Sequence, residues 1–134
     1  MRTTVAAVLL AAAALTGCGT DPAPPPAYTV INQGERQLGL GTAGWADLLM
    51  PGATVAQAQD AIRTYGETIR GDATMYTIAV IHDTTATTHG KPATTYVCMG
   101  RWVKDEQASR TWADSSITSD TWPAIGMNCP DRRG

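Results

Sequence analysis

The clearest repeat of apolar positions lies in residues 54–70 and has the spacing of an α-helix. Apolar side chains recur there at steps of three and four residues, at Val55, Ala58, Ile62, Tyr65 and Ile69. Such a stripe runs along one side of an amphipathic helix. Thr54 comes just before the stripe and Gln57 follows three residues later, which is the spacing of a capping box. The pattern therefore predicts a helix over residues 54–70, ending before Gly71.

Four further segments carry the residue types that are common in strands. Residues 75–82 and 95–104 are rich in β-branched and aromatic side chains, and a polar connection separates them. These two segments predict a central strand and an antiparallel neighbour, joined as a hairpin with a long loop. Residues 28–33 and 37–50 predict two earlier strands, with Gly34 as the turn between them.

Together these elements predict a single α+β domain over residues 28–134. The expected order is β-β-α-β-β, with room for a short C-terminal strand. Strands that pair mainly antiparallel, with one helix at about 54–70 on one face, form a small two-layer sandwich. A chain of 134 residues has room for one such domain and little more.

The N-terminus carries a different pattern, an unbroken apolar run from residue 5 to residue 15. Its 11 residues match the apolar core of a secretory signal peptide and are too few to cross a bilayer, which takes about 20 residues. Arg2 supplies the positive charge that usually precedes such a run. Residues 1–17 are therefore assigned to a signal peptide rather than to the fold.

The motif Leu15-Thr16-Gly17-Cys18 directly follows this run. It resembles the lipobox of bacterial lipoproteins, in which Leu, a small residue, and Gly or Ala precede the Cys. The resemblance implies that Cys18 is diacylated and that a signal peptidase then cuts before it. It also implies a protein held by acyl chains in the cell membrane, on the extracytoplasmic face. An ordinary signal peptide that happens to contain a Cys is the alternative.

Residues 18–27 would join the lipidated Cys to the domain. The nine residues after Cys18 read GTDPAPPPA, a composition that favours an extended polyproline-type chain. A chain of that kind rises about 3.1 Å per residue and would place the domain roughly 25–30 Å from the lipid. The sequence thus predicts a lipid anchor, a tether and a globular head.

Two cysteines remain in the head, Cys98 and Cys129. In a secreted protein an even number of remaining cysteines predicts a disulfide, which here would pin the C-terminal segment against the strand that carries Cys98. A metal site would need further ligands near the pair.

Composition and motifs narrow the class of function. The chain has 10 Lys and Arg against 12 Asp and Glu, for a formal net charge of −2, so it lacks the basic surface that nucleic acid requires. Gly39, Gly41 and Gly44 match the spacing of a dinucleotide fingerprint, but no helix is expected to begin at Gly44. The serines lie outside any known nucleophile motif. No cofactor is therefore expected.

His82, Asp83 and His89 are the candidate residues for chemistry. They lie at the end of a predicted strand and in the loop that follows it. Imidazoles with a carboxylate can bind a metal or move a proton. They support an alternative in which the head is a small metal-dependent or hydrolytic enzyme. No third metal ligand is evident, so no metal site is assigned.

Trp102, Trp112 and Trp122 are spaced ten residues apart, and Ser, Thr and Asp lie between the last two. Such residues are suited to stacking on a sugar or to holding a protein partner. A structural alternative places Trp102 in the core and the other two over the open face of the sheet.

The sequence therefore favours a lipid-anchored envelope lipoprotein whose head binds an envelope protein or a glycan, in preference to an enzyme. Two other hypotheses stay open. One is a surface-exclusion lipoprotein carried by a phage or a plasmid, and the other is an accessory subunit of an envelope complex.

Overall fold

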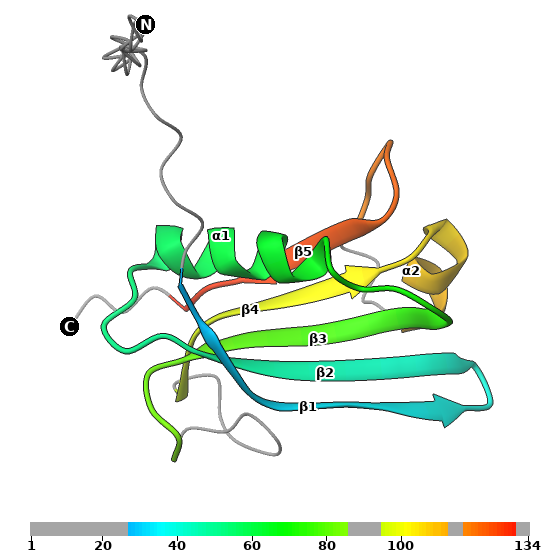
Figure 1. The fold of residues 1–134 in the computed structure, drawn as a ribbon. Helices are drawn as coiled ribbons and strands as arrows, with labels where there is room; N and C mark the ends of the chain where they lie inside the picture. The colour runs from blue at the N-terminus through cyan, green and yellow to red at the C-terminus, as the bar shows by residue number, and fades with distance from the viewer. Residues whose placement is uncertain (1–26, 86–94, 113–116, 131–134) are drawn as a thin grey trace, which may run out of the picture.

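The computed structural model describes residues 27–85, 95–112 and 117–130. These residues form a mixed five-stranded sheet and two helices (Figure 1). The strands are β1 (Thr29–Leu38), β2 (Gly41–Leu49), β3 (Ala73–Ile81), β4 (Tyr96–Val103) and β5 (Ala124–Asn128). The helices are α1 (Val55–Gly66) and α2 (Glu106–Trp112). The predicted α+β class is therefore confirmed.

The strands lie in the sheet in the order of the chain, β1-β2-β3-β4-β5. β2 and β3 are parallel, and α1 makes the crossover between them. The other neighbouring pairs are antiparallel. β3 is therefore the central strand, as the sequence predicts, and β1 and β5 form the two edges.

Two of the sequence expectations are wrong. The order is not β-β-α-β-β, because α2 and β5 follow β4. α2 has only 7 residues, most of them polar, so no apolar stripe marks it. The turn is not at Gly34 either, since β1 continues through Gly34 and the chain turns at Gly39 and Leu40. Gly34 is tolerated inside the strand because the Trp45 ring fills the space that a side chain at residue 34 would take.

The capping box predicted for α1 is present. The Thr54 hydroxyl accepts a hydrogen bond of 3.2 Å from the Gln57 N–H, and the Gln57 side chain accepts one of 2.9 Å from the Thr54 N–H. The helix ends at Gly66, a few residues before the predicted end at residue 70. Within the described ranges, no helix is both long enough and apolar enough to cross a membrane.

α1 covers one face of the sheet, over β3 and β4 (Figure 1). Ile62 points from the helix into this core and is fully buried. Gly100 on β4 leaves the space that the Ile62 side chain occupies. The main buried partners on this face are Ala46, Leu48, Ile78, Val80, Cys98 and Trp102.

A row of aromatic rings extends this core toward β1. The ring centroids of Tyr28 and Tyr65 are 6.3 Å apart, those of Tyr65 and Tyr76 are 6.2 Å apart, and those of Tyr76 and Trp102 are 6.5 Å apart. The Tyr76 hydroxyl donates a hydrogen bond of 2.7 Å to the Glu35 carboxylate on β1. Burial, together with this hydrogen bond, raises the pKa of Tyr76 well above its ordinary value.

The face of the sheet opposite α1 carries a smaller apolar cluster. Its buried members are Ala79, Ile81 and Tyr96. Asp47 lies among them on β2 with only 2% of its surface exposed. Its carboxylate accepts a hydrogen bond of 3.1 Å from the Asn32 amide on β1, which compensates in part for its burial.

Candidate functional site

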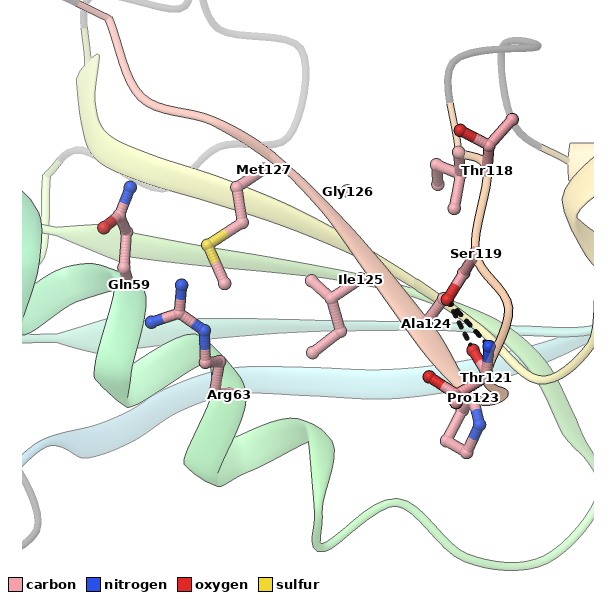
Figure 2. A pocket seen from close by; sticks show the side chains of 11 residues that line it. Gln59, Arg63, Thr118, Ser119, Thr121, Pro123, Ala124, Ile125, Gly126 and Met127 are labelled. Atoms are coloured by element: carbon pink, nitrogen blue, oxygen red, sulfur yellow. Dashed lines mark hydrogen bonds between the residues drawn. The ribbon is translucent and has the colours of Figure 1, made fainter.

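A groove lies along β5 and is lined by side chains from α1, from β5 and from residues 117–123 (Figure 2). It encloses about 540 Å³, which falls within the range of ligand-binding clefts. The lining mixes hydroxyl, amide and guanidinium groups with aliphatic side chains, and comprises Gln59, Arg63, Ile117, Thr118, Ser119, Thr121, Pro123, Ala124, Ile125, Gly126 and Met127.

α1 contributes Gln59 and Arg63, which are four positions apart and so lie on one side of the helix. Figure 2 shows both side chains pointing from α1 toward β5. Arg63 lies 3.1 Å from Asp60 in an ion pair whose side chains are 57% and 64% exposed. Exposed pairs of this kind contribute less than about 1 kcal/mol. The Arg63 guanidinium can therefore exchange Asp60 for a carboxylate on a ligand at little cost.

β5 contributes Ile125 and Met127, which are partly buried and pack against the core below. β5 is an edge strand, paired with β4 on one side. Among the described residues, no backbone group of β5 is hydrogen-bonded to a further strand. The outer edge of β5 can therefore accept an extended peptide as an added strand.

The segment before β5 is held in place by hydroxyl groups. Ser109 on α2 is buried and donates a hydrogen bond of 3.0 Å to the Ile117 carbonyl. Ser119 donates one of 2.7 Å to the Thr121 carbonyl and accepts one of 3.2 Å from the Thr121 N–H (Figure 2). Ile117 packs against Gly126, where a Cβ would lie 2.8 Å from Ile117 Cγ1. These contacts fix the rim of the groove on β5.

The structure separates the three tryptophans that the sequence grouped as a binding surface. Trp102 is 6% exposed and packs in the core beneath α1, so it cannot belong to a surface platform. Trp112 ends α2, and its carbonyl accepts a hydrogen bond of 3.4 Å from Arg101. Its indole N–H is buried and has no hydrogen-bond partner in the described part of the chain. Trp122 is half-buried beside α2, in a separate hollow of about 490 Å³.

The proposed histidine site is described only in part. His82 follows β3, is half-buried and lines a hollow of about 610 Å³ beside Cys129. Asp83 accepts hydrogen bonds of 2.8 Å and 2.6 Å from the backbone N–H and the hydroxyl of Thr85. His89 lies outside the described residues. Within the ranges that the structure covers, no three His, Cys, Asp or Glu side chains are placed to hold a metal ion.

The predicted disulfide between Cys98 and Cys129 is confirmed. It joins β4 to the residue that follows β5, and so fixes the C-terminal end of the groove. The Gln59 amide lies 3.6 Å from the Cys129 sulfur, which places α1 against the same end. Cys18 and residues 1–26 lie outside the described residues.

No sequence motif singles out the residues of the groove. Arg63 belongs to the polar side of the predicted helix, which is ordinarily solvated, and Gln59 is half-buried. Met127 is brought near them only by the pairing of β5 with β4, which is a long-range feature. The spacing of Gln59 and Arg63 along one helix face was the single local signal.

No family model, no curated protein and no solved structure matches this chain. The function of the groove is therefore argued from its own geometry.

Proposed function

We propose that this chain is a lipid-anchored lipoprotein of the bacterial cell envelope and that its head is an extracytoplasmic binding module. The groove along β5 carries the proposal, because it combines polar side chains, an apolar floor and an open strand edge within about 540 Å³. The lipobox-like motif that ends at Cys18 supports the anchor. The disulfide between Cys98 and Cys129 supports an oxidising, extracytoplasmic compartment.

The favoured partner is an extended segment of an envelope protein. β5 can form main-chain hydrogen bonds with such a segment, and these give affinity without a fixed sequence. Arg63 can then select a carboxylate side chain or a C-terminal carboxylate, since a guanidinium binds both oxygens of that group. A glycan offers no strand for β5 to pair with, and so it is the second choice for this groove.

The anchor is tested by replacing the lipidated residue. The Cys18→Ala protein should lose incorporation of labelled fatty acid and should leave the membrane fraction. A Thr16→Ser variant keeps a small residue within the motif and should stay in the membrane, which controls for effects on export. Membrane retention of Cys18→Ala protein at the wild-type level would contradict the anchor.

The groove is tested by photo-cross-linking in intact cells. A photoreactive residue at Gln59 should give a discrete protein adduct, because this position lines the groove. The same residue at Ala56 is the control, since Ala56 is exposed on α1 and does not line the groove. Arg63→Gln should reduce the adduct from position 59. Identical adducts from positions 56 and 59, or none from either, would contradict the proposed groove.

A further inference from the structure

The turn between β1 and β2 carries exposed leucines. Leu40 is 66% exposed, more than any other large apolar residue in the described ranges, and Leu38 is 42% exposed. The turn lies at the end of β1 opposite to Thr29, where the strand begins (Figure 1). Large apolar side chains that are exposed close to one another can form a contact surface.

The chain that leads into the turn and out of it has the residue types of a lipid–water interface. Residues 36–46 contain one arginine and no Asp or Glu. Arg36, Leu38 and Trp45 line a shallow hollow of about 400 Å³ on the face of the sheet opposite α1. Within the described residues, Arg36 forms no ion pair. Arginine can bind lipid phosphates, and tryptophan is enriched at the level of the headgroups.

We propose that this turn, with Leu38 and Leu40 at its tip, docks into the surface of the same membrane to which Cys18 is anchored. Arg36 lies at the headgroup phosphates in this arrangement. The inference deepens the proposed function and rests on its lipid anchor. It gives the head a fixed orientation on the bilayer, with the β1–β2 hairpin toward the lipid.

The lengths of the chain segments allow this arrangement. The nine residues after Cys18 span at most about 30–32 Å when fully extended. β1 has 10 residues, and a strand rises about 3.4 Å per residue, so the turn lies about 31 Å from the start of β1. A chain that leaves the membrane through residues 19–27 can therefore return to it along β1. A tether much shorter than β1 would not let β1 stand upright with its turn at the surface of the bilayer.

The anchor explains why two leucines suffice. Two partly exposed leucines would not hold a free protein on a membrane, because interfacial binding scales with the apolar area that is buried. An attached lipid keeps the turn at a high effective concentration near the surface, so that a weak contact is populated. The docking of the turn is therefore expected only in the lipidated protein.

Methyl NMR of the lipidated protein, which begins at Cys18, in lipid nanodiscs tests this proposal. The discs contain phosphatidylcholine, phosphatidylglycerol and a small amount of spin-labelled lipid. The chain after Cys18 has four leucines, Leu38, Leu40, Leu48 and Leu49. Leu48 is fully buried, and Val55 matches Leu38 in being 42% exposed. Insertion to about 5–10 Å should broaden the methyl signals of Leu38 and Leu40 at least about threefold more than those of Val55.

Two variants identify the side chains responsible. Leu40→Ser should reduce the broadening at Leu38, because the tip loses its most exposed apolar group. Arg36→Gln should reduce it in discs that contain phosphatidylglycerol and have little effect in discs of phosphatidylcholine alone. Both positions are exposed, so neither variant removes core packing.

The outcomes separate failure of the turn from failure of the anchor. The docking is overturned, and the anchor is left intact, if the protein stays on the discs while its methyl signals broaden equally or not at all. The signals compared are those of Leu38, Leu40 and Val55. Broadening at Leu38 that is unchanged in Leu40→Ser overturns it as well. If the purified protein carries no acyl chain and elutes apart from the discs, the anchor is overturned, and the docking is overturned with it.

Discussion

The disulfide should supply a large share of the stability of the head, and its removal can be given a magnitude. Cys98 and Cys129 are 31 residues apart. For a loop of this size, the loss of chain entropy in the unfolded state corresponds to about 3.7 kcal/mol. Small domains are stable by only about 5–15 kcal/mol. Replacing both cysteines with alanine should therefore remove much of the free energy of unfolding and lower Tm by about 15–30 °C.

Urea denaturation at 25 °C, followed by far-UV circular dichroism, measures this loss. The double variant is compared with the oxidised wild type and with the wild type after reduction by dithiothreitol. Reduction keeps both sulfurs and opens the loop, so it isolates the contribution of the cross-link from that of the buried Cys98 side chain. A loss below about 1 kcal/mol in both samples would refute the chain-entropy argument.

Three further predictions concern local packing and pH. Gly100→Ala places a Cβ against Ile62 and should cost about 1–3 kcal/mol in urea denaturation, whereas Gly39→Ala, with no atom nearby, should cost less. Thr54→Ala removes the cap of α1 and should cost about 1 kcal/mol, and an unchanged urea midpoint would contradict the cap. Because burial raises the pKa of Tyr76, the unfolded chain loses this proton first as pH rises above about 10, so stability should fall there. Tyr76→Phe should make that fall shallower in denaturation measured between pH 9 and pH 11, and an equally steep fall would contradict the assignment.

The elements that the sequence predicts well are those with a strong local signal. Thr54 and Gln57 mark the start of α1 through a contact between residues three apart. Ala58, Ile62 and Tyr65 of the apolar stripe are buried and show that it fixes which side of the helix faces the sheet. The central position of β3 follows from side chains that are buried on both faces, which is a property of the segment itself.

The elements that the sequence misses depend on distant partners. β1 passes through Gly34 because Trp45, on the neighbouring strand, covers the glycine. A glycine seen without that partner predicts a turn. α2 is short and polar, and it is held by its contacts with β3 and β4 rather than by an apolar stripe.

The candidate site depends on the same kind of long-range pairing. Trp102 is of a residue type that is common in binding sites. Its position in the register of β4, however, points it toward α1 and into the core. Arg63 looks like an ordinary solvated side chain until β5 is placed beside the helix. The sequence could therefore indicate the disulfide, which follows from the number of cysteines, but not the groove, which depends on the pairing of β5 with β4.

The order of the strands also bears on how the chain reaches its native state. Each strand lies beside the strand that precedes it in the chain, but most of the paired residues are far apart in sequence, as Thr42 and Ala73 or Met75 and Val103 show. Pairing between residues that are distant in sequence slows folding. β1 and β2 are the exception, since the short turn at Gly39 and Leu40 joins them directly. Cys129 directly follows β5, so the pairing of β5 with β4 brings it beside Cys98. The two cysteines are thus brought together by the arrangement of the sheet rather than by closeness in sequence.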